Sequence, residues 1–75
     1  MKYFTGEEIQ IGDNVFIENR RTQGVVKHII ETNNDMRNFN VEEKGVMLKS
    51  KPFGLVFWPI EYKDDPVVFE SRKST

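Results

Sequence analysis

The chain lacks cysteine altogether, and this absence limits both its chemistry and the ways in which it can be stabilised. Without cysteine there is neither a disulfide nor a thiolate zinc site, so a domain of 75 residues must depend on side-chain packing. Six Phe, two Tyr and one Trp supply large side chains for a small core, whereas a disordered chain would be poor in them. We therefore expect a single folded domain over residues 1–72, with a frayed tail at 73–75.

The chain also lacks a surplus of positive charge and any long apolar run. Eleven Lys and Arg against twelve Asp and Glu give a net charge of −1, which argues against a domain that binds nucleic-acid phosphates. No window approaches the roughly 20 apolar residues that span a bilayer, and the opening MKYFTGEE does not resemble a signal peptide. We expect a cytoplasmic protein that does not contact a membrane.

Catalytic constellations are missing as well. His28 is the only histidine, and no partners for a triad or a metal site accompany it in the sequence. Acidic residues occur in adjacent pairs, which point to opposite faces in a strand and are solvated in turns. We therefore expect no enzyme, no metal or other cofactor and no small-molecule substrate.

What the sequence does contain is a series of short β-forming segments separated by turn residues. The stretch 11–30 predicts two strands, at 15–18 and 24–32, joined by a polar hairpin loop and entered through a Gly-Asp turn. The spacing of Val26 and Ile29 does not alternate, which indicates a bulge near Lys27 and His28. Gly24 is expected to supply unusual backbone angles at the start of the second strand.

Three further strands are predicted at 45–50, 55–60 and 67–71, with Pro59 at the end of a strand or on an unpaired edge. The polar interval 33–44 predicts a surface loop that Phe39 fixes, with Asn40 capping a single helical turn, or else a partner-binding loop. No other helix is expected. Because five strands in a flat sheet would leave exposed edges, the sequence predicts an all-β fold, a small five-stranded antiparallel SH3-like barrel. An OB-like barrel is the alternative.

Trp58 is the most informative single residue of the fourth strand. If Leu55 and Phe57 point inward, then Val56 and Trp58 point outward, because side chains alternate along a strand. An exposed Trp58 beside Met47 would be an interface anchor. The other possibility is that Trp58 covers an open end of the barrel.

Several short motifs resemble those of small bacterial proteins that are encoded beside polymorphic toxins and taken to be immunity proteins. Their positions span nearly the whole chain: Tyr3 with residues 5–9, Gly12-Asp13 before Val15, Gly24-Val25-Val26, Gly45-Val46-Met47, Gly54-Leu55 and Arg72. Members of this group carry a segment rich in Trp and Tyr before the third strand. Here that place holds only Phe39, a departure from the group's pattern.

This resemblance implies a non-enzymatic protein that neutralises a cognate toxin domain by occluding its active site. Acidic groups would face a basic cleft, and aromatic side chains would be the buried anchors. The residues expected to bind the partner are Glu42, Glu43, Trp58, Tyr62, Asp64 and Asp65.

A second resemblance, over residues 11–30 only, is to the KOW type of SH3-like module, which binds ribosomal RNA or transcription factors. It implies nucleic-acid binding as the alternative function. The basic residues expected to carry it are Arg20, Arg21, Lys27 and Lys49.

Overall fold

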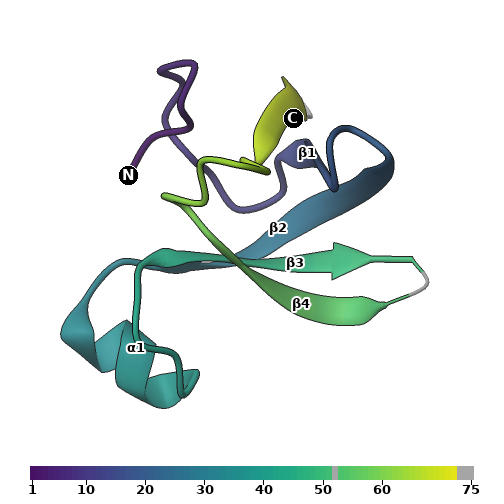
Figure 1. The fold of residues 1–75 in the computed structure, drawn as a ribbon. Helices are drawn as coiled ribbons and strands as arrows, with labels where there is room; N and C mark the ends of the chain where they lie inside the picture. Colours follow the sequence, from purple (N-terminus) through teal and green to yellow (C-terminus); the bar gives the residue numbers. More distant parts are fainter. Residues whose placement is uncertain (52, 73–75) are drawn as a thin grey trace.

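Five antiparallel strands form one strongly bent sheet in the computed structural model, which describes residues 1–51 and 53–72 (Figure 1). The strands are β1 (Asn14–Ile17), β2 (Thr22–Ile30), β3 (Gly45–Ser50), β4 (Gly54–Pro59) and β5 (Val68–Ser71), and their order across the sheet is β4-β3-β2-β1-β5. The predicted all-β fold with five antiparallel strands is confirmed. The proposed frayed tail at 73–75 lies outside the described residues.

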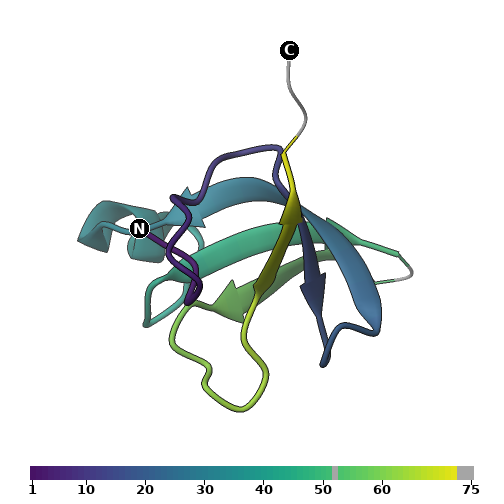
Figure 2. The ribbon, with the colours of Figure 1, turned by 90° about the horizontal axis from the view of Figure 1, so that it is seen from above.

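The two outermost strands, β4 and β5, are not paired with each other in the described part of the chain. Figure 2 shows how the bend of the sheet brings β5 and the preceding loop over the sheet face, while the ladder ends at β4. The sheet is therefore open, and its closure into an SH3-like barrel is not shown. Pro59 lies at the end of the edge strand β4, as its missing N–H requires.

The predicted irregularity in β2 is present. Val26 pairs with Leu48 and His28 with Met47, so Lys27 is an extra residue without a partner in β3. This bulge returns Ile29 to the face that Val26 occupies, and Ile29 packs against the core.

Alternation along the strands builds the core on one face of the sheet. Val15 and Ile17 of β1 lie inside while Phe16 between them is half-buried on the other face. The chain from the first residue to β1 also contributes to the core, through Tyr3 and Ile9. The buried residues of this cluster are Tyr3, Ile9, Val15, Ile17, Val26, Val46, Leu48 and Val67.

Gly45 permits a close approach between β3 and β4. A Cβ at this position would collide with the carbonyl oxygen of Trp58 and lie 2.8 Å from the Phe57 ring. By contrast, Gly24 has no left-handed φ, so its expected role was wrong. Positive φ angles occur instead at Glu18, Asn19 and Arg20 in the hairpin turn.

A short helix, α1 (Asn33–Asn38), occupies the interval that was expected to be a loop. Thr32 begins it: its side chain accepts from the Asp35 N–H, and the Asp35 carboxylate accepts from the Thr32 N–H. The helix ends at Phe39, and Asn40 adopts a φ of 56° just beyond it. The expectation of no helix apart from a single turn capped by Asn40 was therefore wrong. Phe39 does fix the segment, because its ring lies 4.9 Å from that of His28 on β2.

Candidate functional site

Two neighbouring hollows, which share Tyr62, bring together four of the six residues predicted to bind a partner. Trp58, Tyr62 and Asp65 line one hollow of 450 Å³, together with Glu18 and Arg21. Tyr62 also lines a second hollow of 500 Å³, whose other charged residues are Glu43, Glu61 and Lys63. We call the residues of both hollows the Tyr62 surface. Each hollow has two acidic side chains and one basic side chain, so the surface is acidic.

Tyr62 is positioned by the turn that follows β4. Its N–H donates to the Pro59 carbonyl oxygen, and its ring centroid lies 6.0 Å from that of Trp58. The side chain remains 45% exposed although it contacts the walls of both hollows. An exposed aromatic ring between two concave regions is a suitable anchor for a protein partner.

Trp58 faces the interior, so its predicted outward orientation was wrong. Val56 and Trp58 pack against the core, and Leu55, which was expected inside, is 52% exposed. Trp58 pairs with Val46, while Phe57 is the residue beside Met47. The indole N–H donates to the Asp65 carbonyl oxygen at 2.7 Å, which satisfies its polar atom. Trp58 thus lines a hollow, and its ring lies beside that of Tyr62.

The acidic residues of this region differ in how firmly they are held. Asp65 is half-buried, and its Oδ1 accepts from the Asn19 N–H at 2.8 Å, which ties the loop before β5 to the β1–β2 turn. Glu42, Glu43 and Asp64 are exposed. Glu42 and Asp64 line neither hollow but are next in sequence to residues that do.

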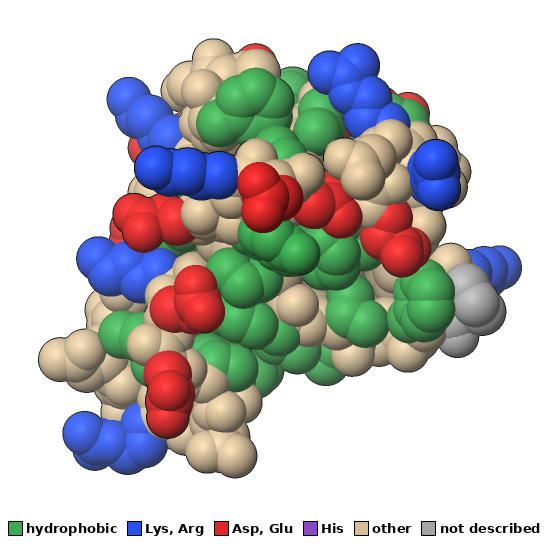
Figure 3. Space-filling model, viewed as in Figure 1, with side chains coloured by type: hydrophobic (Ala, Val, Ile, Leu, Met, Phe, Trp, Pro, Cys, Tyr) green, Lys and Arg blue, Asp and Glu red, His purple; other side chains and the backbone are tan. Residues whose placement is uncertain are grey.

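Apolar groups extend the region along β4. Figure 3 shows hydrophobic side chains gathered over the part of the molecule where β3 and β4 lie, with acidic side chains beside them. Phe53 and Leu55 are the large apolar residues exposed at the beginning of this strand. Such a combination of apolar area and an excess of acidic side chains is typical of a surface that binds protein.

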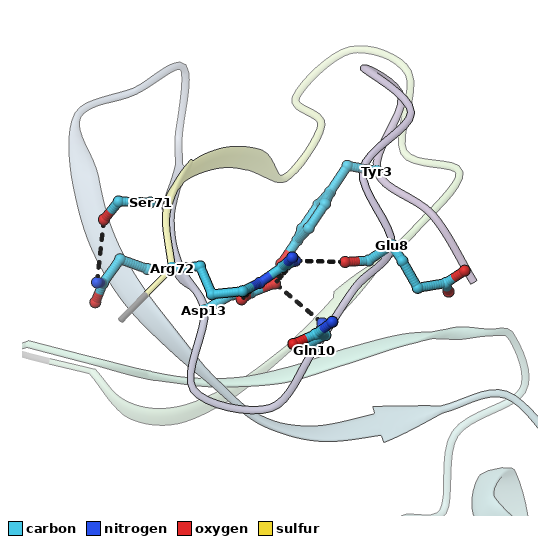
Figure 4. A network of polar contacts seen from close by, with 7 residues as sticks. Tyr3, Glu8, Gln10, Asp13, Ser71 and Arg72 are labelled. Carbon is cyan, nitrogen blue, oxygen red and sulfur yellow. Dashed lines mark hydrogen bonds and ion pairs between the residues drawn. The ribbon is translucent and has the colours of Figure 1, made fainter. Parts of the chain in front are cut away.

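The sequence did not predict a buried polar network around Asp13 (Figure 4). The Asp13 side chain is fully buried, and its carboxylate accepts from the Tyr3 hydroxyl at 2.7 Å and from the Gln10 N–H at 3.0 Å. Arg72 binds both carboxylate oxygens, at 2.8 and 3.1 Å, and also donates to the Glu8 carbonyl oxygen.

The charges of this network explain its pKa shifts. Burial alone would raise the pKa of Asp13, but the hydrogen bonds from Arg72 and Tyr3 outweigh it and hold the pKa below its ordinary value. Burial, with the hydrogen bond to Asp13, raises the pKa of the Tyr3 hydroxyl, so Tyr3 stays protonated. Among the described residues, no buried side-chain nitrogen or oxygen lacks a hydrogen-bond partner. The network is therefore a structural clasp between residues 3–13 and the end of β5.

His28 is exposed, and its ring is tilted against that of Phe39. Within residues 1–51 and 53–72, no cluster of three or more His, Asp or Glu side chains is arranged to hold a metal ion. In the same part of the chain, no helix has the length and hydrophobicity needed to cross a membrane.

Comparisons with known proteins give no relationship. No model of a known family matches the sequence, and searches of curated proteins and of solved structures found no match either.

Proposed function

We propose that this protein is a non-enzymatic binding module whose partner is another protein, and that the Tyr62 surface is its binding site. The observation that carries the proposal is the position of Tyr62, exposed between two hollows that each have an excess of acidic side chains. A partner would bury the ring in a desolvated contact, and basic side chains on the partner would face Glu43, Glu61 and Asp65.

The most concrete form of the proposal is an immunity protein that covers the active site of a cognate bacterial toxin. A toxin that acts on nucleic acid has a basic cleft, and the sign of the Tyr62 surface is complementary to such a cleft. The exposed acids Glu42 and Asp64 would increase the rate of association by long-range attraction. Trp58 would act indirectly, because it packs against the core and its ring lies next to that of Tyr62.

Co-purification with the protein encoded by the neighbouring gene tests this function directly. We expect a stable complex, and Tyr62→Ala should weaken it by about thirtyfold or more, the usual effect of removing an aromatic hot spot. Failure of the wild-type protein to bind that neighbour, or to protect cells that express it, would refute the immunity function.

A matched pair of charge reversals separates a specific acidic contact from general attraction. Glu43→Lys changes a residue of the Tyr62 surface, whereas Glu31→Lys makes the same charge change at an exposed position outside both hollows. Isothermal titration calorimetry should show a larger loss of affinity for Glu43→Lys. Equal losses for the two variants would mean that the surface has been assigned wrongly.

A further inference from the structure

A third and larger hollow, of 1040 Å³, opens on the face of β1, β2 and β3 that points away from the core. We call it the basic hollow. The residues that matter for its chemistry are Phe16, Arg21, Gln23, Lys49, Lys51 and Glu70. Three cations and one acid give it a positive charge, although the whole chain has a net charge of −1.

The fold, rather than the sequence order, brings these residues together. Phe16 lies between Val15 and Ile17, which are in the core, so its ring points to the opposite face, where Gln23 pairs with it on β2. Lys49 of β3 pairs with Val25 of β2. Arg21 ends the hairpin turn and Lys51 follows β3, so the cations come from separate segments and converge on one hollow.

These cations are not neutralised inside the protein. In the described part of the chain, Arg21, Lys49 and Lys51 form no ion pair. Among residues 1–51 and 53–72, Glu70 is the only acidic residue that lines the hollow. A concave surface with unpaired cations attracts an anionic ligand through charge complementarity.

The ring of Phe16 indicates which class of anion this hollow would bind. A half-buried Phe side chain beside several cations can stack on a planar base while the cations contact the adjoining phosphates, which is the usual chemistry of single-strand binding. An acidic peptide would use the cations but not the ring. A duplex keeps its bases stacked in pairs and offers no free base to Phe16.

We propose that the basic hollow binds a short segment of single-stranded nucleic acid. Phe16 stacks on a base, and Arg21, Lys49 and Lys51 contact phosphates. Two of the four basic residues expected from the sequence, Arg20 and Lys27, do not line the hollow. The low overall charge hid this surface because acidic residues elsewhere in the chain balance it in the composition. The proposal is independent of the protein-binding function, since apart from Arg21 and Thr22 the two regions share no lining residue.

Fluorescence anisotropy with labelled oligothymidylate and oligouridylate of about twelve nucleotides tests the proposal. The wild-type protein should bind, and binding should weaken between about 50 and 200 mM salt with a log–log slope of roughly −2, as three phosphate contacts predict. The double substitution Lys49→Gln with Lys51→Gln should reduce the slope to roughly −0.7.

Phe16→Ala should weaken binding by about tenfold with little change in the salt slope, because it removes stacking and not charge. Lys27→Gln is the matched control, since it removes one exposed cation from β2 outside the hollow and should change affinity by less than about twofold. Thermal unfolding of each variant establishes that the fold is retained, and Phe16→Leu, which keeps apolar volume without a planar ring, replaces Phe16→Ala if that variant unfolds.

Three results would overturn the proposal. One is the absence of oligonucleotide binding at low salt, including the case in which a labelled polyglutamate peptide binds instead. Another is equal or tighter binding of a duplex of the same length. The third is a loss of affinity for Lys27→Gln as large as that for the double substitution Lys49→Gln with Lys51→Gln. None of these results would affect complex formation through the Tyr62 surface, so the two proposals fail separately.

Discussion

Asp13 and the acidic residues around Tyr62 carry the same charge but lie in opposite surroundings. Asp13 is fully buried and accepts hydrogen bonds from Tyr3, Gln10 and Arg72. Glu43, Glu61 and Asp64 are exposed, and among the described residues they form no ion pair. A buried carboxylate is tolerated only when its partners are supplied by the fold, whereas an exposed one can exchange water for a partner's cation.

The difference in burial and in hydrogen-bond partners separates the acidic residues that stabilise the fold from those available for binding. Asp65 lies between the two extremes, because it lines the Tyr62 surface and also holds the Asn19 N–H. Substitutions should therefore affect stability in the order Asp13, Asp65 and then the exposed acids, while effects on partner binding should follow the opposite order.

The largest loss of stability is expected for Asp13→Asn. The substitution leaves Arg72 without its anion and weakens the hydrogen bonds from Tyr3 and Gln10, which should lower the free energy of unfolding by about 3 kcal/mol. Urea denaturation followed by circular dichroism measures it. Glu43→Gln is the control with the same chemical change at an exposed position. A midpoint for Asp13→Asn equal to that control would show that the clasp contributes little.

The pH dependence of stability should report the same clasp. Because the pKa of Asp13 is lowered in the folded protein, its contribution is present above the ordinary pKa of Asp, about 3.9, and is lost as the pH falls below it. Denaturation midpoints measured from neutral pH to about pH 3 should fall less steeply for Asp13→Asn than for the wild type. Parallel pH profiles would contradict the assignment.

Tyr3→Phe should have a smaller effect, because Arg72 and Gln10 still bind the carboxylate. Loss of one hydrogen bond to a charged acceptor should cost about 1.5–3 kcal/mol, while the packing of the ring against Phe69 at 5.3 Å is retained. Thermal unfolding measures this loss. Tyr62→Phe removes a hydroxyl from an exposed ring and should leave the melting temperature nearly unchanged.

The smallest effect on stability is expected for the double substitution Glu43→Gln with Asp64→Asn. Both side chains are exposed, so the free energy of unfolding should change by no more than about 0.5 kcal/mol. The association rate with a basic protein partner should nevertheless fall, and stopped-flow measurements at low and high salt would detect it. A substantial loss of stability would remove the contrast with Asp13.

The features that could be predicted from the sequence depend on local patterns. The strands follow runs of Val, Ile and Phe, and the bulge at Lys27 follows from the odd spacing of Val26 and Ile29. In β4 every residue from Leu55 to Trp58 is apolar, so no polar residue indicates which face is buried, and the orientation of Trp58 was predicted wrongly.

Other features were missed for different reasons. The helix α1 was missed because its capping box, Thr32 with Asp35, has Asp in place of the usual Glu or Gln. Its Asn residues are also poor helix formers. The pair of Asp13 and Arg72 joins positions 59 residues apart. No spacing rule indicates such a contact, although the Gly12-Asp13 turn and Arg72 were both among the sequence motifs. The basic hollow combines residues from separate strands and was predicted only in part.

The bulge in β2 has a consequence for how the length of this chain could vary. Between Val25 and Ile30, Lys27 is the residue of β2 without a counterpart in β3, so its removal would join Val26 to His28 while both keep their present neighbours, Leu48 and Met47. Deletion of His28 would likewise leave Lys27 opposite Met47 and keep Val26 and Ile29 on the core face, whereas deletion of Val26 or Ile29 would place a polar residue, Lys27 or His28, on that face. In homologous sequences, a one-residue gap within this strand is therefore expected at position 27 or 28.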